Sequence, residues 1–289
     1  MNSEAEEEKM ADRMRKQKGS VVITVALTMI IIGLVLFIVG FVLARFIGGN
    51  GKYELVDYSK SFESADVSYI DADIEFGTVK LLRSEDSDIH IEGTKVPEGF
   101  YATLNNDGVL ELRANVKQIY KFEFFGVKAR DFNKTEVDIE LPEKEFKKVA
   151  LQIGAADSEI NDIECGTLYI ECGAGDVSIS GVNCGDSVIK CGAGEVTFSD
   201  FTSKESVRID GGVGEVSFNN STTGGLDVNQ GIGEFSYSGT VNGNIKLDGG
   251  IGEFSIALTN PETDFSKNGG KYTIDIDKGI GESSITYNN

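Results

Sequence analysis

Four cysteines are the first residues in this sequence whose spacing suggests chemistry. They are Cys165, Cys172, Cys184 and Cys191, and 19 residues separate Cys165 from Cys184 and Cys172 from Cys191. If the chain forms coils stacked about 5 Å apart, each pair lies within range of a disulfide bond. The alternative, which we favour, is a column of buried thiols that act as small hydrophobes. A zinc site is disfavoured because no close C-x-x-C spacing is present.

A series of acidic residues recurs at nearly the same interval. The series is Asp157, Asp176, Glu195, Glu215, Glu234, Glu253 and Glu282. Stacked carboxylates repel by less than about 1 kcal/mol per pair in water, and bound Ca²⁺ would relieve that repulsion. We interpret the series as solvated turn carboxylates. A calcium ladder is the weaker alternative, with Asp176, Glu195, Glu215, Glu234 and Glu253 as the candidate ligands.

Most familiar catalytic and cofactor sites are disfavoured by the composition. His90 is the only histidine, so a Ser-His or Cys-His nucleophile would depend on that residue alone. The Gly-x-Gly sequences lack the third glycine of a dinucleotide-binding loop and precede strand-like residues, so no cofactor is expected. A net charge of −20 makes nucleic acid a poor partner. We therefore expect no catalytic residues and no enzyme activity.

Both series belong to a repeat, apolar-x-apolar-x-(Cys/Gly/Gln)-Gly-x-Gly-(Asp/Glu)-apolar-x-apolar. The first glycines of its copies are spaced by 19, 19, 20, 19, 19 and 29 residues, and the last interval contains a ten-residue insertion at 261–270. Looser copies begin at Val149 and end the series. The turn glycines are Gly173, Gly175, Gly192, Gly194, Gly212, Gly214, Gly231, Gly233, Gly250, Gly252, Gly279 and Gly281.

Apolar and polar residues alternate within each copy, which is typical of strands with one buried face. A constant period with a constant inward phase predicts an all-β parallel solenoid, a β-helix-like repeat domain with about 19 residues per coil. An antiparallel meander with a hairpin at each Gly-x-Gly is the alternative. The excess of glycine then reflects turn geometry rather than flexibility.

Residues 61–148 form a less regular β region before the repeats at 149–289. Residues 72–81 resemble an early coil, and Asn106-Asp107-Gly108 predicts a hairpin between 101–104 and 109–112. Residues 137–141 predict a strand ended by Pro142. Residues 122–132 are an apolar-rich excursion that is compatible with a loop, an edge or a contact patch.

Residues 21–44 contain no charged residue and are long enough to cross a bilayer, so we predict a transmembrane helix there. A cleaved signal peptide is the alternative, although the apolar run is longer than usual for one. Basic residues concentrate before this run, which predicts a cytoplasmic tail at 1–20 and a linker at 45–60. Residues 51–289 then lie outside the cell, with 21 Lys and Arg against 42 Asp and Glu.

The N-terminal apolar segment, the VDIELP sequence ending at Pro142, LQIGAADSEI from Leu151 and the IECGAGDVSI-type units together resemble the bacterial putative adhesin family. That resemblance covers roughly residues 60–289. It implies a cell-surface domain of unknown function built from β-strand repeats, outside the plasma membrane of a bacterium. It supplies no catalytic residue.

We therefore expect a single-pass membrane protein whose external domain is a non-enzymatic scaffold or binding surface. Its partners are the lipid bilayer at residues 21–44 and an envelope polymer or protein ligand. Two alternatives stay open. One is a sensory or regulatory component of an envelope-stress system, and the other is a β-helix enzyme acting on polysaccharides.

Overall fold

The computed structural model describes residues 55–114, 134–265 and 269–287. Contacts divide the chain into two units, and all of the described residues belong to the one formed by 52–116 and 130–289. The predicted tail at 1–20, the predicted transmembrane helix at 21–44 and the apolar excursion at 122–132 lie outside the described residues. Within the described ranges, no helix has the length and apolar character needed to cross a membrane.

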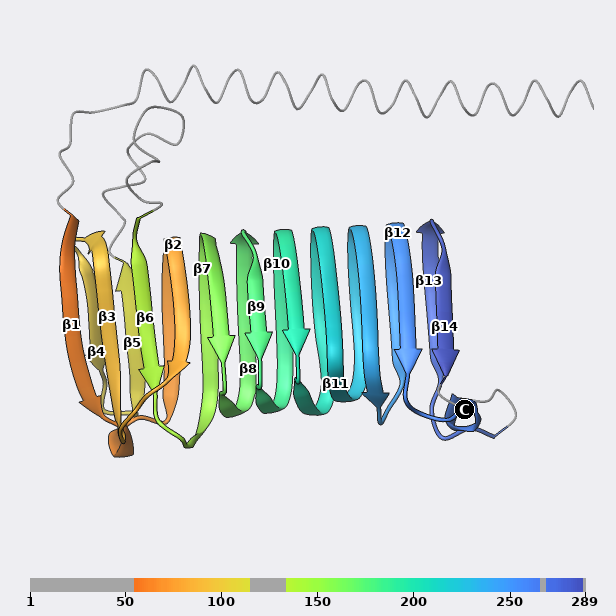
Figure 1. Cartoon of the computed structure of the whole chain (residues 1–289), viewed down its shortest axis with the longest axis horizontal. Coiled ribbons are helices and arrows are strands. Elements are labelled where there is room, and N and C mark those ends of the chain that lie inside the picture. The colour runs from red at the N-terminus through yellow and green to blue at the C-terminus, as the bar shows by residue number, and fades with distance from the viewer. Residues whose placement is uncertain (1–54, 115–133, 266–268, 288–289) are drawn as a thin grey trace, which may run out of the picture. The chain divides into compact units, whose positions relative to one another are not determined.

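The described residues form a single 14-stranded sheet, wound into coils that follow one another along the long axis in Figure 1. Two short 3-10 helices, η1 (Ser64–Asp66) and η3 (Glu262–Phe265), interrupt the strands. The strands are β1 (Leu55–Glu63), β2 (Tyr69–Arg83), β3 (Asp88–Pro97), β4 (Phe100–Leu104), β5 (Val109–Ala114), β6 (Glu136–Leu141), β7 (Glu145–Asn161), β8 (Glu164–Ala174), β9 (Val177–Ser180), β10 (Asn183–Ser199), β11 (Thr202–Val241), β12 (Ile245–Leu258), β13 (Ile274–Ile280) and β14 (Ser283–Tyr287).

Parallel pairing joins each coil to the next at the predicted interval. Glu164 in β8 pairs with Asn183 in β10, and Leu226 in β11 pairs with Ile245 in β12. After the insertion, Ile245 pairs with Ile274 in β13. The prediction of an all-β parallel solenoid is therefore confirmed, and the antiparallel meander is wrong for the repeats. Strand β11 runs through two coils because the backbone keeps its ladder hydrogen bonds around the turn.

The core is a column of apolar side chains that point inward from each coil. Within one coil Leu168, Ile170, Val177 and Ile179 are all buried, as the alternation of polar and apolar residues predicts. Larger aromatic residues fill the following coils. The ring of Phe198 stacks on that of Phe218, with centroids 4.0 Å apart and planes at 4°. Like residues therefore lie on like residues along the axis, which gives each coil the same cross-section.

Strand β2 forms the first coil. Strands β3 to β6 come between it and the second coil, which begins in β7. Ala72 in β2 pairs with Leu151 in β7, so residues 72–81 do form an early coil. Between them, β4 and β5 make the predicted antiparallel hairpin, and β6 contains the predicted strand at 137–141. The predicted linker at 45–60 is corrected at its end. Strand β1 begins at Leu55, because alternate residues such as Tyr58 and Phe62 pack on the core while the backbone pairs with β3.

The insertion at 261–270 lies between the last two coils and contains η3. Its residue Phe265 is buried, and its ring packs 5.7 Å from the ring of Tyr272 and 6.3 Å from that of Tyr287. The loop thus supplies an aromatic residue to the final coil, whose own apolar residues, such as Ile274 and Ile285, are only half-buried.

Replacing Gly233 by alanine should destabilise the fold strongly. Gly233 has φ +142°, and a Cβ atom there would overlap the carbonyl oxygen of Gly214 in the preceding coil. We expect the free energy of unfolding in urea, followed by circular dichroism, to fall by about 3 kcal/mol or more. The control is Ile232→Ala, one residue away, whose side chain is exposed. Equal stability of the two variants would contradict the close stacking of coils.

Candidate functional site

The Gly-x-Gly turns of successive coils stack into one edge of the solenoid. The first glycine of each turn lies against the backbone of the coil before it, and a Cβ atom added at Gly173 would lie 2.6 Å from the carbonyl oxygen of Gly154. The second glycines have positive φ, from +129° at Gly175 to +153° at Gly252. The structure thus brings the predicted turn glycines together along this edge, where only the residue between them can carry a side chain outward.

The middle residues of these turns form a column that changes character along the axis. In the earlier turns the position is alanine, at Ala155, Ala174 and Ala193. In the later turns it is Val213, Ile232, Ile251 and Ile280, and each of these side chains is at least half exposed. We did not single out this column from the sequence, because the motif treats the middle position as variable. The change from alanine to valine and isoleucine at this position is visible when the copies are aligned, and it could have pointed to the column.

The predicted acidic residues follow the turns and are exposed. The early ones bind backbone: Asp157 Oδ1 accepts a hydrogen bond from the N–H of Asp176 at 3.1 Å, and Asp176 Oδ1 accepts one from the N–H of Glu195 at 3.1 Å. Glu195 accepts a hydrogen bond from Thr197. Within the described residues, the later carboxylates have no hydrogen-bond or ion-pair partner. These are Glu215, Glu234, Glu253 and Glu282.

The described part of the chain contains no group of three or more His, Cys, Asp or Glu side chains arranged to hold a metal ion. Successive members of the acidic series come from different coils, with one member after each turn. A cation there would be shared only by stacked neighbours, with the remaining ligands supplied by water. The calcium ladder therefore stays an alternative. The interpretation of the series as solvated turn carboxylates agrees with the exposure of these side chains.

The four cysteines lie in two stacked pairs. Cys165 pairs in register with Cys184, and Cys172 pairs with Cys191. All four are free thiols and buried. Burial raises the pKa of Cys165 to about 12 and that of Cys184 to about 11, and a hydrogen bond to Cys191 together with burial raises the pKa of Cys172. Cys165, Cys172 and Cys184 are therefore poor nucleophiles at neutral pH, whereas the hydrogen bond with Cys172 lowers the pKa of the buried Cys191.

Pairing of β1 with β3 creates a hydrogen-bonded row of a serine, a histidine and an aspartate. Ser61 Oγ lies 2.8 Å from His90 Nδ1, and His90 Nε2 lies 2.9 Å from Asp86 Oδ1. Asp86 Oδ1 also accepts hydrogen bonds from the backbone N–H of Asp88 and from Ser84 Oγ. Residue spacing does not predict this row, because Ser61 and His90 are brought together by strand pairing between distant segments.

This row has the residue types of a hydrolytic triad but a different setting. The aspartate binds Nε2 and the serine binds Nδ1, the reverse of the serine protease arrangement. Asp86 is largely exposed, with 60% of its side chain accessible, whereas a triad aspartate is buried. The hydrogen bond that His90 donates to Asp86, together with the negative charge of Asp86, raises the pKa of His90 above its usual range. We interpret the row as a surface network that joins β1 to the loop before β3.

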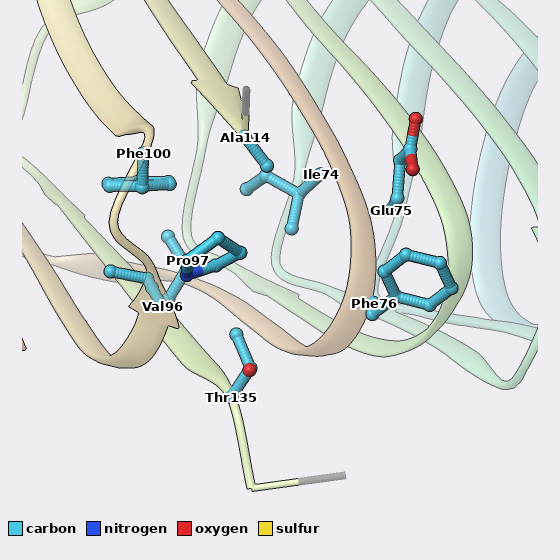
Figure 2. Close-up of a pocket in the computed structure, with 9 residues that line it drawn as sticks. Ile74, Glu75, Phe76, Val96, Pro97, Phe100, Ala114 and Thr135 are labelled. Atoms are coloured by element: carbon cyan, nitrogen blue, oxygen red, sulfur yellow. The ribbon is translucent and has the colours of Figure 1, made fainter. Parts of the chain in front are cut away.

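A small cavity lies near the start of the solenoid, where β2, β3 and β6 meet. Figure 2 shows Ile74, Val96 and Phe100 around it, with Thr135 at its lower side. The Thr135 hydroxyl donates to the carbonyl oxygen of Lys95 at 2.8 Å and is therefore already used. The lining is mainly apolar and includes none of the residues Ser61, His90 and Asp86. The cavity and the polar row are thus separate features.

The fold and the stacked edge define a class of protein: an all-β solenoid of short coils whose turns repeat Gly-x-Gly followed by a carboxylate. A family model described as Toastrack DUF4097 matches residues 67–283, and the chain belongs to this family. A search of curated proteins finds no match.

Several solved structures match this chain at low sequence identity. A "putative adhesin" from Bacteroides fragilis is 15% identical, with 81% of this chain and 97% of that chain covered and a TM-score of 0.48. A "putative cell adhesion protein" from Clostridium sporogenes is 14% identical, with coverage of 81% and 100% and a TM-score of 0.35. A "putative lipid binding protein" from Parabacteroides distasonis is 14% identical, with coverage of 84% and 99% and a TM-score of 0.34.

The pKa of His90 should report on its hydrogen bond to Asp86. Its pKa is raised in the folded chain, so the interaction stabilises the fold fully below the unfolded value of about 6.5 and is lost as pH rises through the folded value. We expect Asp86→Asn to lower the pKa of His90, measured from the single imidazole signal in NMR spectra. An Asp66→Asn variant is the control. An unchanged pKa in the Asp86 variant would contradict the hydrogen bond.

Proposed function

We propose that this chain is a membrane-anchored, extracellular binding scaffold of bacteria, adhesin-like and without catalytic activity. The apolar run at 21–44 crosses the plasma membrane, the N-terminus is cytoplasmic, and residues 51–289 lie outside. The observation that carries the proposal is the stacked turn edge, which repeats an outward side chain and a carboxylate in successive coils. A rigid, regularly spaced surface suits recognition of an extended partner.

The chemistry of the described residues supports binding over catalysis. Catalysis by acid and base needs two groups with different pKa values beside one substrate. The edge instead presents one exposed carboxylate after each turn. All four thiols are buried, and the pKa values of Cys165, Cys172 and Cys184 are raised. The Ser61–His90–Asp86 row is exposed, with the serine at Nδ1 and the aspartate at Nε2 of the imidazole. These features favour a scaffold, and they leave no carboxylate pair to nominate for polysaccharide cleavage.

Thiol labelling of intact cells tests the membrane arrangement. Ser238 is exposed in β11, whereas the native cysteines are buried. We expect a membrane-impermeant maleimide to label full-length Ser238→Cys on intact bacteria. A Ser3→Cys chain should be labelled only after the membrane is opened. The unmodified chain should remain unlabelled until it is denatured, when four thiols should react. Labelling of Ser3→Cys on intact cells would contradict the proposed orientation.

An assay that measures both ligand retention and ligand cleavage tests the proposed role as a binding scaffold. We expect the full chain in nanodiscs to retain a ligand from purified envelope polymers or membrane extracts. The retained ligand should have an unchanged mass, because no catalytic group acts on it. A Gly233→Ala chain, whose edge is disrupted, should retain much less. A polymer shortened by the native chain and left intact by Ser61→Ala would overturn the non-enzymatic proposal.

A further inference from the structure

Four large apolar side chains are exposed in a line on the turn edge. This apolar ridge consists of Val213, Ile232, Ile251 and Ile280, with 56%, 50%, 50% and 71% of each residue accessible. Ile232 pairs in register with Ile251, and Ile251 pairs with Ile280. Of the five large hydrophobic residues exposed in the described ranges, four belong to the ridge. An exposed apolar row rimmed by polar residues is typical of an interaction site.

The fold does not require these large side chains. The same turn position holds Ala174 and Ala193 in earlier coils, and Ala193 pairs directly with Val213. The turn backbone is built in the same way in both places, with Gly175 and Gly233 both at positive φ. The change from alanine to valine and isoleucine therefore adds apolar surface that the turn itself does not need.

The carboxylates change from aspartate to glutamate one coil before the ridge begins, because Glu195 already follows the last alanine turn at Ala193. In the alanine turns, Asp157 and Asp176 accept backbone hydrogen bonds from the next coil. Beside the ridge, each turn carries a longer glutamate without a partner in the described residues. The four glutamates are Glu215, Glu234, Glu253 and Glu282. Three residues before Val213, Ile251 and Ile280, the exposed Asp210, Asp248 and Asp277 add further negative charge, whereas Asn229 holds this position before Ile232. A glutamate thus follows every ridge residue, and an aspartate precedes three of the four.

We propose that the apolar ridge binds a basic amphipathic helix of a partner protein. The helix would place apolar residues on the ridge and Lys or Arg residues against the glutamates. The charges argue against two other occupants. An anionic lipid surface would be repelled, and a second copy of the ridge would bring like charges together. This inference rests on the proposed role as a binding scaffold and specifies its partner class.

The spacing of the ridge fits a helix better than an added strand. Coils are about 4.8 Å apart, so four ridge positions span about 14 Å. Three turns of a helix rise about 16 Å, which places one apolar residue near each ridge position. The backbone of these coils is already hydrogen-bonded along the axis, as the pairing of Gly233 with Gly252 shows. Recognition must therefore occur through side chains.

The test uses a synthetic 18-residue helix with leucines along one face and lysines on both flanks. Its affinity for the full chain in phosphatidylcholine nanodiscs is measured by fluorescence anisotropy, with empty nanodiscs as the background. We expect the Ile232→Ala, Ile251→Ala, Ile280→Ala triple variant to bind at least 30-fold more weakly. We expect a similar loss for Glu234→Gln, Glu253→Gln, Glu282→Gln, and weaker binding at high salt.

Two control peptides separate apolar recognition from simple charge. One has the same composition with the leucines scattered around the helix, and the other has glutamate in place of lysine. Neither should bind. The alanine variant should unfold at the same urea concentration as the native chain, since alanine fills this position in earlier coils.

Equal binding of the helix to the native chain and to both variants would overturn the ridge proposal, and so would equal binding of the scattered peptide. No binding of the helix at all would also overturn it. Binding of phosphatidylglycerol vesicles through the ridge would favour a lipid occupant instead. In each case, retention of an envelope ligand in the pull-down would leave the general binding role standing, so the two failures are distinguishable.

Discussion

The close approach of backbone to backbone at the turn is the constraint on which the rest of the structure depends. Each Gly-x-Gly turn stacks on the preceding one so closely that Gly233 has no space for a Cβ atom beside Gly214. The second glycine also needs a positive φ, which other residues adopt only with strain. Together these requirements keep the turns in register, so extra residues are accommodated away from the turn: Ile280 still pairs with Ile251 although the insertion at 261–270 lies between them.

Once the turn is fixed, the residues that point inward and those that point outward are constrained differently. Inward residues must match the residue above and below them, which explains the stacked rings of Phe198 and Phe218 and the paired thiols of Cys172 and Cys191. Outward residues at the edge meet only solvent and their like neighbours. They can change from Ala193 to Val213 in one step without altering the turn. The edge is therefore where this fold can acquire a binding specificity.

The sequence predicts what is local and repeated, and it fails where contacts are distant or the repeat is weak. The period of 19 and the alternation of apolar residues were sufficient for the parallel solenoid, because every coil contributes the same signal. Strand β1 was assigned in part to a linker, because a single strand of nine residues has no repeat to support it. The Ser61–His90–Asp86 row was also hidden, since it exists only when β1 pairs with β3. The apolar ridge was visible in the copies but lay at the position that the motif left undefined.

The same repetition that makes the fold predictable also bears on its function. Stacked copies of one turn give each carboxylate an environment similar to its neighbours, so the edge does not provide the unlike acid and base that catalysis needs. What repetition does provide is additive contact along a line, with apolar and charged positions at a fixed spacing. The exposed Ile232 and Ile251, bordered by Glu234 and Glu253, have this form. A partner that matches several coils gains from each of them, so modest single contacts sum to useful affinity and the length of the matching segment sets the specificity.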